Sequence, residues 1–395
     1  MALTAVLGVR SNQMLTTNMK SLKCFWSLVC VLVLASNVWS MSHWNEARGV
    51  YDDVCYLRQA HLFQRFGLGG FDTDLARDDD RYLASKLKQI AYPGWNDPAQ
   101  APCHTPMPAS GKLVLQYPPG TGLVLALFPM GHQVIPLYVM ATLIVFGFAV
   151  LAIALARTPS ATALAGIFGC LAVYLMINPA KASYSIAPTM IVCAIAGFLT
   201  ARWLTAQRHN PALIGLLGLL LGLSVNFRLP NLFLGAGYAL FLLGVFLASR
   251  TRKSFAEGLS FGTTFLIGMA PTLIANAINA GSPLATTYSG ADAVSPDFSL
   301  GIVMQYVTDM QFVLLVLALA STVYMLRARL DGARSLALVV AANLLVNLLF
   351  FMSHPVFTPY YTIPIAMLSL WTLLFGFLLQ ATSAGFSTLA IPSTG

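Results

Sequence analysis

Charged side chains are scarce in this chain: Asp, Glu, Lys and Arg make up only 9% of its 395 residues. A soluble globular domain carries about 25% charged residues, whereas here 57% of the residues are hydrophobic. This excludes a soluble domain and predicts a polytopic membrane protein. The formal charge of +8 does not indicate a nucleic-acid partner, because the basic residues stand in short runs between apolar segments and read as topology signals.

Metal-binding spacings are also lacking, since none of the six cysteines belongs to a CxxC or Cys/His pattern. Cys55 and Cys103 lie in a polar segment and can pair only if it faces an oxidising compartment, so the bonded and free states stay equally open. The other four fall in apolar runs and are expected to be packing residues: Cys24, Cys30, Cys170 and Cys193.

Ten apolar runs come near the ~20 residues that a bilayer-crossing helix needs. The first, 24–41, follows the polar stretch 1–23 and lacks a small-x-small cleavage site, so we expect an uncleaved span. Basic residues gather in alternate loops, which places 1–23 and the tail 381–395 in the cytoplasm. The nine further spans, within the bundle 132–380, are predicted at 133–156, 160–178, 183–201, 211–227, 229–249, 258–277, 301–326, 335–352 and 360–380.

The long polar segment 42–131 falls on the extracytoplasmic side in this topology. A helix is predicted over Arg48–Phe66, ended by the glycines that follow it. The run Lys112–Gly131 is broken by prolines and glycines and is too short to span, so it predicts a loop and an interfacial or re-entrant helix.

Two adjacent carboxylates, Asp52 and Asp53, lie near the start of that first helix. A charged pair beside a bilayer is costly unless it has a task or partners, so these residues are the main catalytic candidates. Neighbours on a helix point about 100° apart, so only one can face a cavity while the other caps the helix or holds a partner. The alternative is that both only favour the helix dipole.

Two cations lie beside the bilayer on the same predicted face, Lys181 and Arg228. Either could neutralise a phosphate, and the alternative for both is snorkelling to lipid headgroups. The histidines share no ligand spacing, so each is expected to be a polar residue at the interface.

Four segments then carry a resemblance to a known family. In chain order they are Asp52, Asp53 and Tyr56; the YPPG turn Tyr117–Gly120; the GSPL…Y loop Gly281–Tyr288; and HPVFTPYYTIP, His354–Pro364. In order and topology they resemble the bacterial GT-C glycosyltransferases, the relatives of protein O-mannosyltransferases and lipid A aminoarabinose transferases. The resemblance implies an all-α bundle of about ten spans with interfacial helices in the first outer loop.

The resemblance also implies a function: transfer of a sugar from a polyprenyl-phosphate donor to a glycan, glycolipid or protein acceptor at the periplasmic face of a bacterial inner membrane. Asp52 becomes the general base and Asp53 its neighbour in the site. The residues implied to bind substrate are Tyr56, Tyr117, Pro118, Gly120, Lys181, Arg228, Tyr288, His354 and Tyr360.

The chain departs from the family pattern in two places. Lys181, Ser183 and Ser185 stand where many relatives have a second acidic residue, which leaves a divalent cation open as a cofactor. Tyr360 stands where many have an arginine, which leaves one phosphate contact unaccounted for.

Two other classes of function stay open. A transporter or lipid-linked sugar flippase would bind and release substrate without chemistry, but such proteins usually show repeated halves and ionisable residues near the midplane. The sequence shows no convincing repeat, and its spans are nearly free of charge at their centres. An assembly subunit with no activity of its own is the third interpretation.

Overall fold

The computed structural model describes residues 2–46, 51–108, 110–206, 210–288, 295–328, 332–358 and 360–387. The predicted helix start at Arg48, the middle of the loop after Tyr288 and the end of the tail, 388–395, lie outside the described residues.

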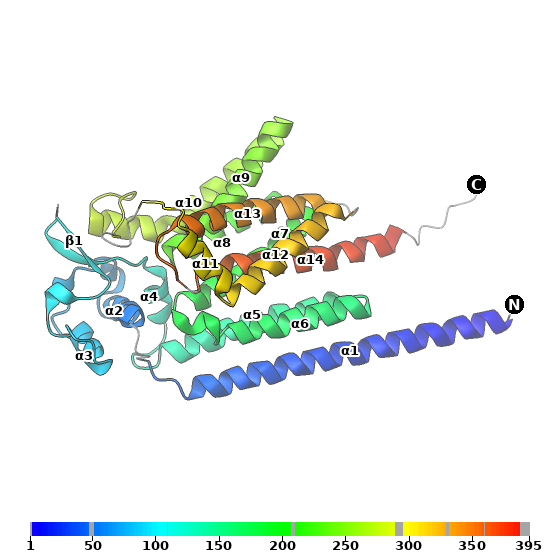
Figure 1. Ribbon diagram of the computed structural model, residues 1–395, viewed down its shortest axis with the longest axis horizontal. Helices are drawn as coiled ribbons and strands as arrows, with labels where there is room; N and C mark the ends of the chain where they lie inside the picture. The colour runs from blue at the N-terminus through cyan, green and yellow to red at the C-terminus, as the bar shows by residue number, and fades with distance from the viewer. Residues whose placement is uncertain are drawn as a thin grey trace.

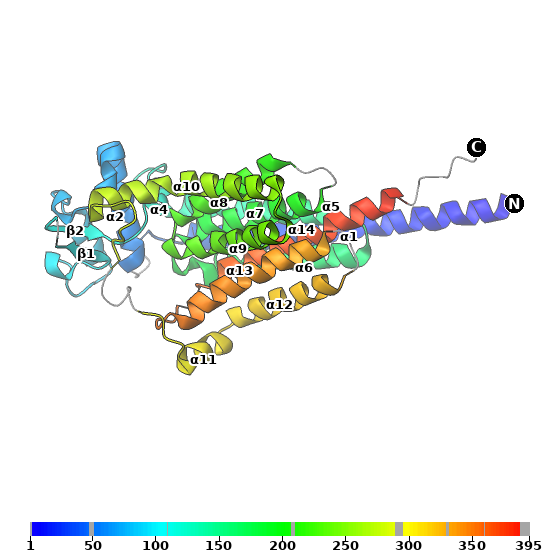
Figure 2. The same ribbon diagram turned by 90° about the horizontal axis from the view of Figure 1, so that it is seen from above.

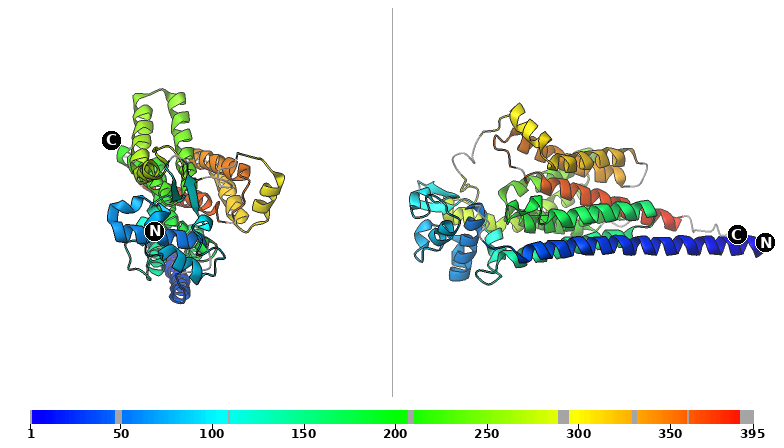
Figure 3. Two further views of the ribbon diagram at one scale, coloured as in Figure 1. Left: turned by 90° about the vertical axis from the view of Figure 1, so that its left-hand side faces the viewer. Right: turned by 60° about the horizontal axis from the view of Figure 1, so that its bottom comes forward.

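The long helices lie side by side in one bundle, and the polar segment from Tyr51 onward lies beyond one end of it (Figure 1). Helix α1 (Ala2–Ser42) runs along the outside of the bundle and extends past it at the other end (Figure 3, right). The start of α1 and the end of α14 (Ile363–Ser387) both lie at that other end. The alternation of helices predicted from the apolar runs therefore returns the chain to the side on which it starts.

Eight helices among the described residues are long and apolar enough to cross a membrane, so the chain is a multi-pass integral membrane protein. They are residues 18–42 of α1, α5 (Val134–Leu155), α6 (Pro159–Leu175), α7 (Ile186–Thr205), α9 (Leu232–Ser249), α10 (Arg252–Ala280), α13 (Ala333–Ser353) and α14.

The remaining two of the ten predicted spans differ from expectation. Helix α8 (Pro211–Val225) has only 15 residues, fewer than a full span needs. The span predicted at 301–326 is two helices, α11 (Leu300–Thr308) and α12 (Gln311–Arg327), which meet at 89°; Figure 2 shows α11 turning away from α12. At the break Asp309 has an extended backbone conformation, and its carboxylate accepts the backbone N–H of Gln311 at 2.9 Å.

Short helix α8 is held in the bundle by close packing on α10. A Cβ added at Gly222 would collide with the backbone carbonyl of Phe265, and one at Gly268 would collide with that of Leu219. Small residues that let two backbones approach are typical of helix contacts inside membranes.

The outer segment is a small folded unit rather than a set of interfacial helices alone. It contains α2 (Tyr51–Phe66), the 3₁₀ turns η1 (Gly67–Phe71), η2 (Leu75–Arg77) and η3 (Pro98–Gln100), α3 (Tyr82–Gln89), strands β1 (His104–Met107) and β2 (Lys112–Leu115), and α4 (Gly120–Leu125). The two strands pair antiparallel in a small hairpin that the sequence did not predict, within a chain that is otherwise helical as expected. The predicted glycine end of α2 is confirmed, because Gly67 has a φ of +54° that favours glycine.

A disulfide joins Cys55 on α2 to Cys103 just before β1. Of the cysteines expected to be packing residues, Cys30 and Cys193 are buried and Cys170 is half-buried. Cys24 is exposed on α1, so the packing interpretation is wrong for that residue.

Candidate functional site

Helix α2 places both candidate carboxylates in its first turn. Eleven of its sixteen residues are buried, because it packs between the rest of the outer segment and the end of the bundle. A helix enclosed in this way holds its side chains in fixed directions, which a catalytic group requires.

Asp53 ties the outer segment to the bundle. Its side chain is 1% exposed and accepts the backbone N–H of Tyr184 at 3.2 Å. Tyr184 lies between the 3₁₀ turn η4 (Pro179–Ala182) and α7. Of the two roles predicted for the pair, that of holding a partner therefore belongs to Asp53.

Asp52 is half-buried and has an aromatic partner. The hydroxyl of Tyr117 donates to its Oδ1 at 2.5 Å, and the Tyr117 ring stacks on Tyr56 at 4.9 Å. Burial and then the negative charge of Asp52 raise the pKa of Tyr117 far above its ordinary value. Tyr117 therefore stays a neutral hydrogen-bond donor that holds the Asp52 carboxylate in place.

The YPPG turn is docked on the end of α8. The N–H of Gly120 donates to the carbonyl of Asn226 at 2.7 Å, and a Cβ at Gly120 would lie only 2.7 Å from that same residue. A glycine is needed at this position because two backbones meet. The contact brings Tyr117, and with it Asp52, to the connection between α8 and α9, where Arg228 lies.

Arg228 is a buried cation held between aromatic rings. Its side chain is 6% exposed, and its guanidinium carbon lies 4.7 Å from the ring centre of Tyr361 and 5.1 Å from that of Tyr360. Among the residues that the structure describes, the guanidinium has no carboxylate or other hydrogen-bond partner. A buried charge in this state is costly, and a bound anion would relieve that cost.

The acidic and basic groups share one electrostatic environment. Burial raises the pKa of Tyr56, a hydrogen bond to Ser185 and the charge of Arg228 lower it, and Asp52 raises it again. Tyr360 responds in the same way: burial raises its pKa and Arg228 lowers it. The charges of Asp52 and Arg228 therefore both act on these two tyrosines, although the two charged residues come from distant parts of the sequence.

The other predicted substrate-binding residues have different surroundings. The Tyr288 ring centre lies 6.3 Å from that of Tyr117, and Pro118 lines the same cavity as these two rings. Lys181 is exposed on η4, and the His354 ring stacks on Phe350 at the end of α13.

Sequence reasoning missed three contributors. Tyr184 acts through its backbone N–H and Asn226 through its carbonyl, so no side-chain pattern could reveal them. Tyr361 holds Arg228 more closely than Tyr360 does. The adjacent tyrosines at 360 and 361 were a usable signal, because aromatic ring faces attract a guanidinium.

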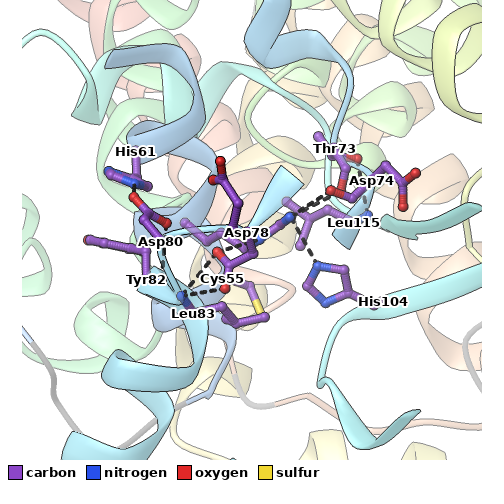
Figure 4. Close-up of polar contacts among 12 residues, drawn as sticks. Cys55, His61, Thr73, Asp74, Asp78, Asp80, Tyr82, Leu83, His104 and Leu115 are labelled. Carbon is purple, nitrogen blue, oxygen red and sulfur yellow. Dashed lines mark hydrogen bonds and ion pairs between the residues drawn. The ribbon is translucent and has the colours of Figure 1, made fainter. Parts of the chain in front are cut away.

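A second polar network stabilises the outer segment. Arg58, fully buried, donates to the carbonyls of Thr73 at 3.0 Å and Asp74 at 2.9 Å and lies 3.1 Å from Nε2 of His104. At the other end of the network His61 points to Asp80 at 2.6 Å (Figure 4). The interpretation of these two histidines as membrane-interface residues is therefore wrong.

The burial of this network affects its ionisation. Desolvation and the nearby Arg58 guanidinium lower the pKa of His104 to about 3. His104 is therefore neutral at physiological pH and accepts a hydrogen bond from the guanidinium through its Nε2.

Metal ligands and comparisons with known proteins were the two other sources of evidence about this site. Within the described part of the chain no three His, Cys, Asp or Glu side chains come close enough to hold a metal ion. Comparisons with protein-family models, curated proteins and solved structures find no match.

Proposed function

We propose that this protein is an integral-membrane glycosyltransferase that moves a sugar from a polyprenyl-phosphate donor to an acceptor hydroxyl on the periplasmic face of a bacterial inner membrane. The observation that carries the proposal is the pair formed by half-buried Asp52, which Tyr117 holds, and buried Arg228, which lies over the rings of Tyr360 and Tyr361. A base and an anion-binding group are the two functions that this displacement needs.

In the proposed reaction Asp52 takes the proton of the acceptor hydroxyl. The acceptor oxygen then forms a bond to the anomeric carbon, and the bond from that carbon to the phosphate oxygen breaks with its electron pair. Polyprenyl phosphate leaves toward Arg228, which neutralises its charge. A direct displacement of this kind inverts the configuration at the anomeric carbon. Asp53 acts as a positioning residue through Tyr184.

Arg228 also compensates for the tyrosine at position 360. Many GT-C glycosyltransferases have an arginine near that point, whereas in this chain Tyr360 forms one of the two rings that contact a guanidinium from the α8–α9 connection. Stacking on aromatic rings fixes the planar fork of an arginine without consuming its five N–H donors. The missing phosphate contact is thus supplied by a different segment in this proposal.

An apolar groove suits the lipid part of the donor. It lies between α9 and α10, which together project from the bundle (Figure 3, left), and has a volume of about 680 Å³. Its outer end includes Leu232, which also lines the cavity beside Tyr117. A prenyl chain in this groove would bring its phosphate to the level of Arg228.

The disulfide between Cys55 and Cys103 supports a periplasmic site, because disulfides persist in oxidising compartments. Nucleotide sugars are made in the cytoplasm, so an outer site needs a donor that is tethered to lipid. Both termini then lie in the cytoplasm.

The proposal is tested with protein purified into lipid nanodiscs and radiolabelled polyprenyl-phosphate sugars. Wild-type protein should transfer label to an envelope glycan, lipid or protein acceptor, whereas Asp52→Asn should remain folded and inactive. Asp97→Asn is the matched control, since it changes an exposed carboxylate of the same outer segment. Full activity of Asp52→Asn would remove Asp52 as the base, and movement of a lipid-linked sugar across the bilayer without transfer would favour the flippase.

A further inference from the structure

A cavity of about 160 Å³ lies beside Tyr117, the residue whose hydroxyl holds Asp52. Its walls come from the end of β2, the Tyr117–Pro119 turn, the outer end of α10 and the segment 283–288. An engineered cavity of roughly 150 Å³ takes up a benzene ring, so this one has room for a single six-membered ring.

The wall of the cavity is uncharged and mostly apolar, with a minority of polar side chains. None of the described residues that line it is charged, although Asp52 and Arg228 lie close by. Instead it contains four amide side chains, Gln59, Gln116, Asn276 and Asn279, together with threonine and tyrosine hydroxyls. Groups of this kind both donate and accept hydrogen bonds, which suits hydroxyls, and the described wall offers no cation to neutralise a phosphate or a carboxylate.

Part of this wall is rigid. The Asn279 oxygen accepts the N–H of Thr73 at 3.0 Å and its hydroxyl at 3.2 Å, and the amide nitrogen donates to the carbonyl of Phe71 at 2.8 Å. Asn279 is therefore fully used in joining α10 to the outer segment.

Gln59 differs from Asn279 because one of its atoms lacks a partner among the described residues. The side chain is 1% exposed, and its nitrogen donates to the carbonyl of Tyr117 at 3.3 Å. Its Oε1 is buried with no hydrogen-bond partner in that part of the chain. That oxygen lies against Gly122, where an added Cβ would come within 2.6 Å of it, so Gln59 contributes to the wall without presenting this atom to the cavity.

Aromatic rings complete the cavity. The rings of Tyr117 and Tyr288 are tilted by 54° with their centres 6.3 Å apart, and both line the cavity. Ligand pockets commonly combine such aromatic surfaces with a few polar groups that fix orientation. A pyranose presents apolar C–H faces and hydroxyl edges, which match the two kinds of wall.

We propose that this cavity is a subsite for one uncharged sugar ring. Its use in catalysis rests on the proposed function, in which the ring belongs either to the donor or to the acceptor. In both cases Tyr117 connects the subsite to the proposed general base, since its ring lines the subsite and its hydroxyl holds Asp52. The subsite therefore selects a neutral hexose or pentose over a uronic acid or a sugar phosphate.

The test measures binding directly by saturation-transfer NMR on the full chain in nanodiscs, with methyl hexopyranosides and the matching methyl hexuronides and hexose phosphates as probes. Neutral glycosides should bind and the charged ones should not. Tyr288→Leu and Asn276→Leu should each weaken binding about tenfold through a lost ring contact or hydrogen bond. Tyr324→Leu, which removes an exposed tyrosine on α12, should bind like wild type.

Two further experiments show whether the subsite holds the donor sugar or the acceptor sugar. Displacement of the glycoside by a polyprenyl-phosphohexose assigns the subsite to the donor sugar, and simultaneous binding assigns it to the acceptor. Equal binding of neutral and charged sugars, or wild-type binding by both cavity variants, would overturn the inference. Glycoside binding that follows this pattern in a protein with no transferase activity would instead refute the proposed function and leave the subsite standing.

Discussion

Replacing Arg228 tests the proposed mechanism most directly. Arg228→Gln keeps a polar side chain of similar length and removes the charge. Two unit charges about 4 Å apart interact with about 4 kcal/mol at the effective dielectric constant typical of protein sites. If that interaction is made mainly with the leaving phosphate, kcat/KM should fall by about 10²–10³. Arg228→Lys keeps the charge but loses the planar fork, so we expect a loss of about tenfold.

The structure also predicts what Arg228→Gln does to stability. The variant loses contacts with two aromatic rings, each worth about 0.5–2 kcal/mol. It also relieves the cost of a buried charge that has no carboxylate partner among the described residues. These effects oppose each other, so the thermal unfolding midpoint should stay close to that of wild type.

Binding of the product separates charge from packing. Polyprenyl phosphate should raise the unfolding midpoint of the wild type and leave that of Arg228→Gln unchanged, because only the wild type offers a cation to the phosphate. Arg202→Gln is the matched control, since Arg202 also lies over an aromatic ring, Phe198 at 5.9 Å, but on α7 near its other end. Wild-type activity and wild-type stabilisation by polyprenyl phosphate in Arg228→Gln would refute the assigned role.

Three more predictions concern the outer segment. Asp52→Asn should lower transferase activity by about 10²–10⁴ with normal yield, whereas Asp53→Ala should lower thermal stability by about 1–3 kcal/mol because the N–H of Tyr184 loses its buried acceptor. Replacing both Cys55 and Cys103 by alanine removes a link across 48 residues worth about 4 kcal/mol, so limited proteolysis should cut the outer segment faster. The pKa of His104 is about 3 when folded and 6.5 when unfolded, so the unfolded segment binds more protons between these pH values. The unfolding free energy of the segment should therefore fall by up to about 1.4 kcal/mol per pH unit as the pH drops below 6.5, and proteolysis should become faster. His104→Gln should reduce that pH dependence.

Each of these predictions has a contrary result. Equal loss of activity in Asp52→Asn and Asp53→Ala at wild-type stability would contradict their separate roles. Unchanged proteolysis without the disulfide would mean that the buried Arg58 network alone holds the segment. A pH dependence that is the same in His104→Gln would assign it to other groups, such as Asp80, whose pKa the hydrogen bond to His61 lowers against the effect of burial.

Prediction from sequence worked best where a pattern extends over many residues. Eight of the ten apolar runs correspond to spanning helices, because some twenty apolar residues between polar loops have few alternatives in a membrane. It failed where a single contact decides the outcome. One apolar run is two helices that meet at 89° beside Asp309, and the short hairpin of β1 and β2 depends on pairing that no local periodicity reveals.

The same division applies to the candidate site. The pair Asp52 and Asp53 was visible because carboxylates are rare in this sequence, but their different roles depend on Tyr117 and Tyr184, which lie 65 and 131 residues away. The sequence identified Arg228 as a cation beside the bilayer. Its burial between Tyr360 and Tyr361 depends on how α8, α9 and α14 pack.

The sequence by itself determined that this chain crosses the membrane many times, where most of its helices lie and which polar residues are exceptional, because hydrophobicity and charge are properties of each residue and its close neighbours. Only the tertiary structure decided which carboxylate is tied to the bundle, that Cys55 and Cys103 are bonded, and that an uncharged cavity lies beside Tyr117. These features join segments far apart in the chain, and the closeness of such segments is set by packing rather than by any local pattern.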